Sequence, residues 1–242
     1  MEKQSAIARE SIINSGANLQ NQRVLIVGGS SRMGLEVARQ TAAKGAFVII
    51  SSRSADKLQA AAAELSSVVQ IYAADASKMD EAERLMKDLA PLNHIVVTAA
   101  SSGSVSSIVD TSPTDAQNAF SRFWLSYHVL HFRPGMVRLS GSITLLSGSS
   151  GRRPVAGYGV WGTLHGSIEA LARSAALELA PIRVNVISPG GIGLRPDRQL
   201  AHHPGQPADV AAMAISLITN PAVTNAVINV DGGERLGAWS GS

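Results

Sequence analysis

The segment VGGSSRMG, residues 27–34, has the residue types and spacing of a phosphate-binding turn. It follows an apolar, β-branched run at residues 24–27 and precedes a helical pattern that ends at Gly45. In a strand–turn–helix unit, backbone N–H groups and the positive end of the helix point at the turn, where an anion can bind. The segment therefore predicts a nucleotide-binding turn; a plain tight turn is the alternative interpretation of its glycines.

The residues that end the second apolar run indicate which nucleotide would bind. A carboxylate at this place would hydrogen-bond the ribose diol of NAD and repel a 2′-phosphate. The run instead ends in Ser51, Ser52 and Arg53, with no acid beside them. Hydroxyls and a guanidinium suit a phosphate, so the sequence favours NADP over NAD. The alternative is that Arg53 lies on a solvated turn.

Short apolar runs alternate with helical patterns along the rest of the chain. This β-α-β rhythm predicts an α/β fold, a doubly wound parallel sheet of seven strands with helices on both faces. Ligand is then expected at the carboxyl ends of the strands, near the switch in strand order. The expected strands are residues 24–27, 46–50, 68–72, 94–98, 142–146, 183–187 and 226–230, and the expected helices are residues 55–65, 78–89, 114–131, 156–179 and 208–218.

Composition is consistent with one domain and excludes several kinds of site. The 242 residues are 45% hydrophobic and 16% charged, enough for one large core. We expect residues 23–242 to form that domain and residues 1–22 to be an N-terminal extension, either a short helix against a neighbour or a frayed tail. The chain contains no cysteine, which excludes disulfides, thiolate metal sites and cysteine nucleophiles.

Charge and hydropathy bear on partners and location. No apolar run approaches the roughly 18 residues that span a bilayer, and residues 1–20 lack the apolar centre of a signal peptide, so we expect no membrane partner and a cytoplasmic location. The net charge is +3, but the arginines are scattered, so nucleic-acid binding is not expected. The adjacent His202 and His203 have no carboxylate close to them in the sequence, and no metal site is expected.

Five pieces at matched spacing resemble the short-chain dehydrogenase/reductase family over residues 23–233. They are VGGSSRMG, ISSR, Asp75 after the third strand, ELAPIRVNVISPG and INVDGG. The resemblance implies a Rossmann-type fold, an NAD(P)-dependent oxidoreductase that interconverts a ketone and an alcohol of a small organic substrate, and a homodimer or homotetramer built through the two long helices. Together with the Ser52–Arg53 pair, it makes NADP(H) the expected cofactor.

The resemblance also implies a cofactor-binding set. Arg32 replaces the family's middle glycine, and would either crowd the backbone's approach to a phosphate or offer it a guanidinium. Asp75 with Ala76 matches the pair that holds the adenine, although Asp75 also suits the cap of a following helix. The full set is Gly28, Ser30, Ser31, Arg32, Met33, Gly34, Ser52, Arg53, Asp75, Ala76, Ala99, Ala100, His165, Pro189, Gly190 and Ile192.

The family's usual catalytic residues are an asparagine, a serine, a tyrosine and a lysine. In this sequence a different residue type stands at each matching position. Aligned from Glu178, the lysine position falls on His165, the tyrosine position on Trp161, the serine position on Gly148, the asparagine position on Phe123 or near Arg122, and a nicotinamide-binding threonine on Leu194. The resemblance therefore implies an atypical active site.

Three residues remain as catalytic candidates. His165 with a pKa near neutrality could act as acid or base, Tyr158 could donate a proton, and Ser147 could bind a substrate oxygen. Tyr158, Trp161 and His165 would share one face if the helix includes Tyr158. The alternatives are an aromatic stripe in a core or interface, a non-redox enzyme (a lyase, dehydratase or cyclase) on the same scaffold, and a catalytically silent homologue that binds a nucleotide or a partner.

Overall fold

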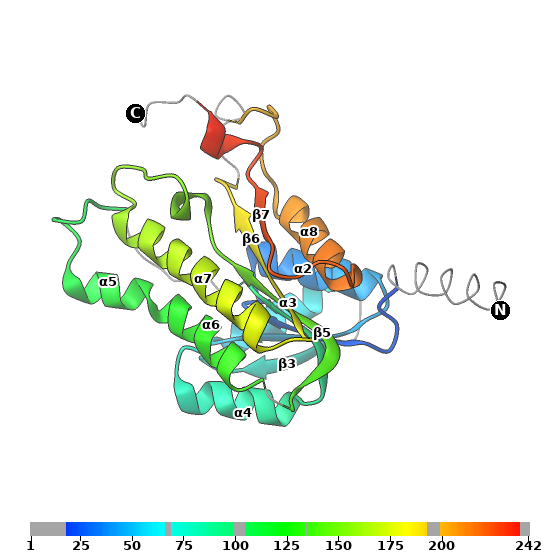
Figure 1. Ribbon diagram of the computed structural model, residues 1–242. Helices are drawn as coiled ribbons and strands as arrows, with labels where there is room; N and C mark the ends of the chain where they lie inside the picture. The colour runs from blue at the N-terminus through cyan, green and yellow to red at the C-terminus, as the bar shows by residue number, and fades with distance from the viewer. Residues whose placement is uncertain (1–17, 66–68, 99–104, 134, 193–198, 238–242) are drawn as a thin grey trace.

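The computed structural model describes residues 18–65, 69–98, 105–133, 135–192 and 199–237, and these form a seven-stranded parallel sheet between two layers of helices (Figure 1). The strand order is β3-β2-β1-β4-β5-β6-β7, so the order reverses between β1 and β4. The prediction of a doubly wound sheet is confirmed. The strands are β1 Arg23–Val27, β2 Phe47–Ser52, β3 Val69–Ala73, β4 Leu92–Val97, β5 Val137–Leu146, β6 Arg183–Pro189 and β7 Val227–Val230.

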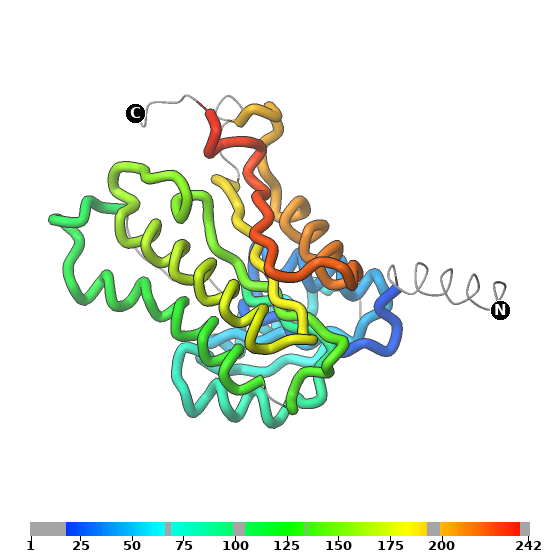
Figure 2. Tube along the Cα trace, viewed as in Figure 1, coloured from blue at the N-terminus to red at the C-terminus, as the bar shows by residue number. Residues whose placement is uncertain are grey.

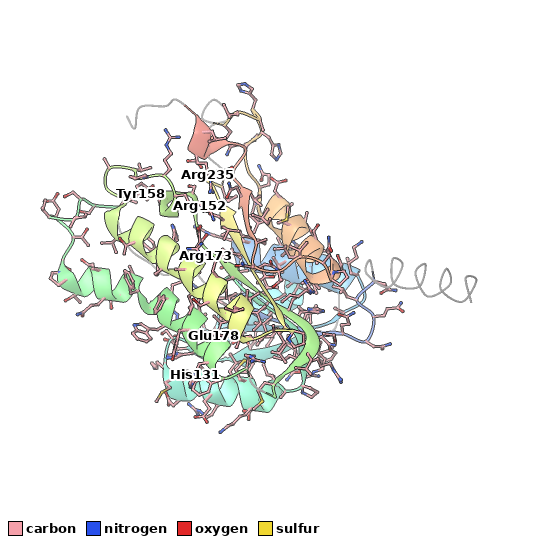
Figure 3. The ribbon with its side chains drawn as sticks, viewed as in Figure 1. His131, Arg152, Tyr158, Arg173, Glu178 and Arg235 are labelled. Carbon is pink, nitrogen blue, oxygen red and sulfur yellow. The ribbon has the colours of Figure 1, made fainter. Side chains whose placement is uncertain are left out.

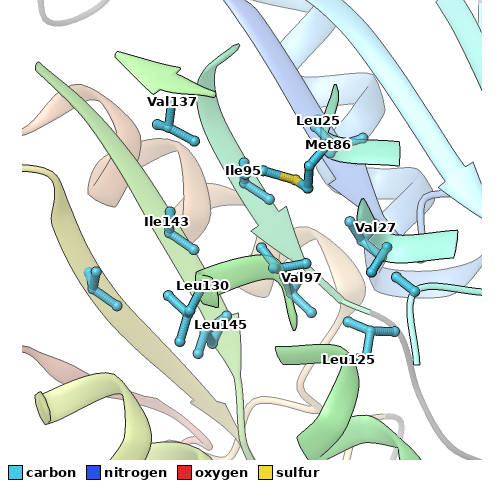
Figure 4. Packing of buried hydrophobic residues seen from close by; sticks show 14 of the residues in the cluster. Leu25, Val27, Met86, Ile95, Val97, Leu125, Leu130, Val137, Ile143 and Leu145 are labelled. Atoms are coloured by element: carbon cyan, nitrogen blue, oxygen red, sulfur yellow. The ribbon is translucent and has the colours of Figure 1, made fainter. Parts of the chain in front are cut away.

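Side chains of the central strands alternate between two hydrophobic clusters, one on each face of the sheet. In β1, Leu25 and Val27 belong to one cluster, and Val24 and Ile26 belong to the other. Such continuous apolar strands are typical of a parallel sheet that is covered on both faces. Figure 4 shows the first cluster, in which Met86 from a helix packs beside the strands.

The helices divide between the two faces as their apolar residues require. Helices α4, α6 and α7 contribute to the first cluster, and α2, α3 and α8 contribute to the second. Figure 2 traces the last strand, in red, beside the yellow β6 with which it pairs. The helices are α2 Arg32–Ala43, α3 Ala55–Glu64, α4 Met79–Leu89, α5 Pro113–Ala119, α6 Ser121–His131, α7 Gly159–Glu178 and α8 Pro207–Thr219, with 3₁₀ turns at Ser149–Gly151 and Glu234–Leu236.

Two expected helices differ from the structure. The single helix expected over residues 114–131 is interrupted at Phe120, which ends α5 and precedes α6. The helix expected from residue 156 begins at Gly159, because Gly157 has a φ of +82°, a left-handed conformation that interrupts a right-handed helix. Both corrections concern elements that border the candidate site.

The ends of the chain are described only in part. Most of the expected N-terminal extension, residues 1–17, lies outside the described residues. Its last part packs on the domain, since Leu19 is buried and its N–H donates to the carbonyl of Lys44 at 2.9 Å. Among the described helices, none is both long and apolar enough to cross a membrane.

Candidate functional site

A cleft of about 950 Å³ lies at the carboxyl ends of β1, β2, β3 and β4, where the strand order reverses. A switch in strand order leaves a crevice at this edge of a doubly wound sheet. The cleft brings together most of the expected cofactor-binding residues: Gly28, Ser30, Ser31, Arg32, Met33, Gly34, Ser52, Arg53, Asp75 and Ala76. Sequence reasoning thus placed these residues at one site, and their contact with a cofactor stays a prediction.

The glycine-rich turn is held against β2 and the start of α2. The N–H of Gly28 donates to the carbonyl of Ser51 at 2.7 Å, with a φ of +92° at Gly28. At Gly34, a Cβ atom would lie 2.5 Å from Oγ1 of Thr98 and closer still to the carbonyl oxygen of Gly28. The turn therefore closes only because residue 34 has no side chain.

Helix α2 begins in a way that leaves its first N–H groups available. Ser31 is the N-cap residue, and its hydroxyl makes no capping bond in the described structure. Arg32, the first residue of α2, has a φ of +49°, where a residue other than glycine is uncommon. Arg32 lines the cleft with its side chain at this unusual backbone position. The start of α2 thus offers N–H donors to an anion, and a contact between the Arg32 guanidinium and a phosphate stays a prediction.

Basic and hydroxyl side chains line the cleft beside the end of β2. Arg53 follows the strand, and Lys57 lies in the first turn of α3. Ser54 caps α3 by accepting a hydrogen bond from the N–H of Lys57 at 3.3 Å. Ser52, the last residue of β2, completes this group. The local charge is positive, as the sequence predicted.

Asp75 lines the same cleft but is engaged within its own turn. Its carboxylate accepts hydrogen bonds from the N–H of Ser77 at 3.1 Å and from the Ser77 hydroxyl at 2.6 Å. The N–H of Asp75 donates to Glu81 in the first turn of α4 at 2.7 Å. These contacts order the turn before α4, whose N-cap residue is Lys78 rather than Asp75.

A second polar cluster connects α6, α7 and the 3₁₀ turn after β5. The guanidinium of Arg122 donates to Nε2 of His165 at 3.4 Å, and Nδ1 of His165 lies 2.9 Å from the hydroxyl of Ser150. Burial, assisted by the charge of Arg122, lowers the pKa of His165 to about 3. The expected pKa near neutrality is therefore wrong, because the imidazole is buried beside a fixed cation.

Ser147 and Glu169 form a separate hydrogen-bonded pair, which Arg152 joins. The hydroxyl of Ser147 donates to the Glu169 carboxylate at 3.0 Å, and Nε of Arg152 donates to the same carboxylate at 2.8 Å. Ser147 and Glu169 are both buried, so the serine is committed to an internal partner. This contact contradicts the expectation that Ser147 is placed to bind a substrate oxygen.

Comparison with known proteins decides the family. A family model described as enoyl-(acyl carrier protein) reductase matches residues 28–234. The chain belongs to the short-chain dehydrogenase/reductase family. A short-chain dehydrogenase/reductase of Stachybotrys chlorohalonatus is 29% identical, covering 90% of this chain and 98% of the relative. A galactitol 2-dehydrogenase of Cereibacter sphaeroides is 30% identical, covering 86% of this chain and 92% of the relative.

Solved structures of the short-chain dehydrogenase/reductase family have the same fold. A reductase/Diels-Alderase from Malbranchea aurantiaca superposes with a TM-score of 0.85 at 25% identity, covering 93% of this chain and 99% of that chain. A small-chain dehydrogenase in complex with NADPH superposes with a TM-score of 0.76 at 27% identity, covering 89% and 99%. The expected family and Rossmann-type fold are confirmed.

Tyr158 does not share a helical face with His165. It is the N-cap residue of α7, with a φ of −106° and a ψ of 18°, and its side chain is 38% exposed (Figure 3). The shared face required a helix that includes Tyr158, and α7 begins one residue later. Trp161, at the family's tyrosine position, does lie next to His165, with ring centroids 6.3 Å apart.

The remaining expected cofactor residues lie elsewhere in the fold. Pro189 ends β6, and the N–H of Gly190 donates to the carbonyl of Val230 at 3.0 Å. His165, Pro189, Gly190 and Ile192 are not among the residues that line the cleft. Ala99, Ala100 and Leu194 lie outside the described residues.

Sequence reasoning missed three side chains that shape the site. Arg122 entered only as a neighbour of the expected asparagine position, and Ser150 did not enter at all. Glu169 carried a usable signal, because it is an acidic residue four positions after His165 in a helix with an apolar pattern, GSIEALARSAAL. That spacing places both side chains on one helical face.

We expect Gly148→Ala to lower the free energy of unfolding by about 1–3 kcal/mol, the usual cost of overpacking. A Cβ atom at position 148 would lie 2.7 Å from Nδ1 of His165, whose ring is held by Arg122 and Ser150. Removing the ring should relieve the overlap, so Gly148→Ala combined with His165→Ala should cost less than the sum of the two. Urea unfolding of the four proteins measures this coupling, and strictly additive losses would contradict it.

Proposed function

We propose that this short-chain dehydrogenase/reductase is an NADP(H)-dependent oxidoreductase that interconverts a ketone and an alcohol of a small organic substrate. The observation that carries the proposal is the group of basic and hydroxyl side chains beside the end of β2. Arg53, Lys57 and Ser52 line the cleft where the 2′-phosphate of NADP is expected. No acidic residue stands at positions 51–54, and Asp56 in the first turn of α3 is not among the residues that line the cleft. A 2′-phosphate would satisfy this positive charge.

The cleft fits a dinucleotide. Its volume lies within the range of small-molecule and cofactor sites, about 300–1,000 Å³. The close approach of Gly34 to Gly28 shapes the turn so that the start of α2 faces the cleft. We assign the pyrophosphate to the turn, the 2′-phosphate to Ser52 and Arg53, and the adenine to Asp75 and Ala76. The bound cofactor would supply a hydride or accept one.

Beyond cofactor binding, the chain's own residues fix a proton at a defined atom. A guanidinium only donates hydrogen bonds, so Nε2 of His165 accepts one from Arg122. The neutral imidazole then carries its proton on Nδ1, and this N–H donates a hydrogen bond to the hydroxyl oxygen of Ser150. The O–H group of Ser150 then remains available to donate a hydrogen bond to another group. Neither residue is among those that line the cleft, but the pair connects to it through Arg122, and we propose Ser150 and His165 as the polar groups that act on the substrate. Tyr158, exposed at the start of α7, stays a proposed proton donor.

Arg53→Ala is expected to weaken NADPH binding by about 1.5–3 kcal/mol, the scale of a hydrogen bond to a charged group. This corresponds to a loss of roughly tenfold to 150-fold in affinity. NADH affinity should change little, because NADH lacks the 2′-phosphate. Titration of the wild type and the variant with each nucleotide measures the difference.

The matched control for that titration is Arg84→Ala, an exposed arginine of α4 that does not line the cleft. Its NADPH affinity should equal that of the wild type. Equal losses for NADPH and NADH in Arg53→Ala would refute the assignment of Arg53 to the 2′-phosphate. Failure of the wild type to bind either nucleotide would refute the oxidoreductase proposal as a whole.

We further propose that residues 23–242 act as a single domain in a homodimer or homotetramer, in the cytoplasm. Exposed apolar side chains on α6 and α7 support the assembly: Trp124 and Tyr127 on α6 and Leu177 on α7 are all at least 38% exposed. Light scattering coupled to size-exclusion chromatography measures the state directly. A monomer at all concentrations would contradict the proposed assembly.

A non-redox enzyme is the second candidate, favoured by the polar cluster itself. The family's tyrosine and lysine positions carry Trp161 and His165, and the low pKa of His165 leaves it neutral over the ordinary pH range. A similar structure is that of a protein named as both a reductase and a Diels-Alderase. A lyase, dehydratase or cyclase, or a silent nucleotide-binding homologue, is indicated if NADPH binds but no carbonyl compound of a broad panel is reduced.

A further inference from the structure

Arg122 places a largely buried cation at the inner end of the cleft. The residue belongs to the first turn of α6 and lines the cleft together with Asn118 and Ser121. Burial lowers the pKa of its guanidinium to about 10, so the group stays charged at neutral pH. Among the described residues, no carboxylate forms an ion pair with it. A buried charge without a counter-charge is costly, and proteins usually pair it.

The hydrogen bonds of Arg122 use only part of its donor capacity. Nη2 donates to the carbonyl of Leu146 at 2.6 Å and to that of Ser147 at 3.2 Å, and Nη1 contacts His165. A guanidinium has five N–H donors, so the contacts within the described structure leave two of them for another group. The arginine is thus anchored by one edge to the end of β5 and retains donors for a ligand.

Other buried arginines in this chain have their charge compensated. Arg235 pairs with Asp231 at 2.6 Å, and both side chains are buried. Arg183 has no carboxylate, but it donates to the carbonyls of Leu217 and Ile218 at the negative end of α8. Arg122 has neither form of compensation, and it differs from Arg183 in lining the cleft.

We propose that Arg122 binds a carboxylate of the substrate at the inner end of the cleft, so that the substrates are carboxylate-bearing organic molecules. This inference rests on the proposed function, because it takes the cleft as the reaction site. The Ser121 hydroxyl and the Asn118 amide line the same part of the wall and can donate to the second carboxylate oxygen. Leu125 offers an apolar surface beside them for the carbon skeleton.

The other anion that could reach Arg122 is a phosphate of the cofactor, since the cleft is continuous from the glycine-rich turn to α6. The two sources make different predictions. A residue that binds the substrate carboxylate leaves NADPH affinity almost unchanged when it is replaced. A residue that binds the pyrophosphate lowers NADPH affinity and leaves the affinity for a simple carboxylate unchanged.

His165 provides a readout that does not depend on turnover. Its imidazole accepts a hydrogen bond from Arg122. An anion bound to the guanidinium therefore changes the electrostatic field at the imidazole ring, and with it the chemical shift of the ring. The probe is sodium benzoate, a carboxylate on a rigid apolar ring, and its neutral control is benzamide, which has nearly the same shape. Ionic strength is matched with sodium chloride. The His165 ring resonance, assigned from a His165→Gln variant, is followed by NMR at neutral pH.

Benzoate is expected to shift the His165 resonance in a saturable manner, and benzamide is not. In Arg122→Gln the benzoate affinity should fall by at least about tenfold, as expected for loss of a charge-assisted hydrogen bond. The matched control, Arg173→Gln, removes an exposed arginine of α7 and should bind benzoate as the wild type does (Figure 3). NADPH affinity should stay within a few-fold in both variants.

Three results would overturn the inference. They are no saturable shift up to the solubility limit of benzoate, equal shifts with benzamide, or a large loss of NADPH affinity in Arg122→Gln with unchanged benzoate affinity. If Arg122→Gln does not fold, Arg122→Lys replaces it as a variant that keeps the positive charge. The comparison of benzoate with benzamide in the wild type then still decides whether the site selects a carboxylate. Benzoate binding without any NADPH binding would leave this inference standing while the proposed oxidoreductase function fails.

Discussion

Gly34→Ala is expected to abolish nucleotide binding, with NADPH affinity lowered by more than about a hundredfold. A Cβ atom at this position would overlap the carbonyl oxygen of Gly28 and lie 2.5 Å from Oγ1 of Thr98. The first of these is backbone and cannot rotate away, so the turn and the start of α2 must separate. The N–H groups that face the cleft would move with them.

The same substitution should also lower the free energy of unfolding by about 1–3 kcal/mol, the scale of overpacking in a closed site. Fluorescence titration with NADPH and urea unfolding measure the two effects. The matched control is Gly166→Ala in α7, where the nearest atom to a new Cβ is 3.8 Å away. That variant should bind normally and be at least as stable as the wild type. Wild-type NADPH affinity in Gly34→Ala would show that the turn does not hold the cofactor.

Stability is expected to fall steeply in weakly acidic solution because two histidines, the buried His94 and the partly buried His165, are neutral in the folded state. His94 in β4 lies between the Ser142 hydroxyl at 2.8 Å and the Gln22 side chain at 2.6 Å. Burial, with the charge of Arg183, lowers its pKa to about 4. His165 behaves in the same way, with a pKa of about 3.

The direction follows from which state binds more protons. In the unfolded chain a histidine titrates near pH 6.5. Below this pH the unfolded state therefore binds protons that the two histidines of the folded state do not bind. The stabilisation is complete above about pH 6.5 and is lost as the pH falls toward about 4. Each histidine contributes a slope of about 1.4 kcal/mol per pH unit, and His94 alone loses about 3 kcal/mol over its range.

Urea unfolding at a series of pH values between about 7 and 4.5 tests this expectation, above the range where most carboxylates titrate. His94→Gln should remove roughly half of the slope, whereas His131→Gln, an exposed histidine of α6, should leave it unchanged. A wild-type free energy of unfolding that is flat across this range would contradict the neutral, buried state of both rings.

The fold was predictable because its signals are local. The apolar strands, the glycines of the turn and the residues 52–53 after the second strand are each defined by a short stretch of sequence. The break at Phe120 was not, since the segment has neither glycine nor proline at that point, and tertiary packing decides where α5 ends. The start of α7 depended on one backbone conformation, that of Gly157, which the sequence permits without requiring.

The polar cluster was harder to predict because its chemistry depends on burial and on contacts across the sequence. The alignment found His165, but its low pKa arises first from burial and then from the charge of Arg122, which is 43 residues away along the chain. The sequence offers Ser147 as a hydroxyl for the substrate, but in the structure this hydroxyl donates a hydrogen bond to Glu169. The four-residue spacing of His165 and Glu169 indicates that they share a helical face, but it does not indicate that they meet Arg122 and Ser147, which are far away along the chain.

The close approach of residue 148 to His165 constrains the order in which this chain could evolve. The side chain of a serine at position 148 would overlap the imidazole ring of His165. The ring cannot move aside easily, because Arg122 and Ser150 hold it from two other elements. A mutational path back to the family's serine therefore costs least stability when position 165 changes first, or when both positions change together. Directed-evolution libraries that vary position 148 alone should return folded variants of lowered stability, whereas libraries that vary positions 148 and 165 together should also return variants without that loss.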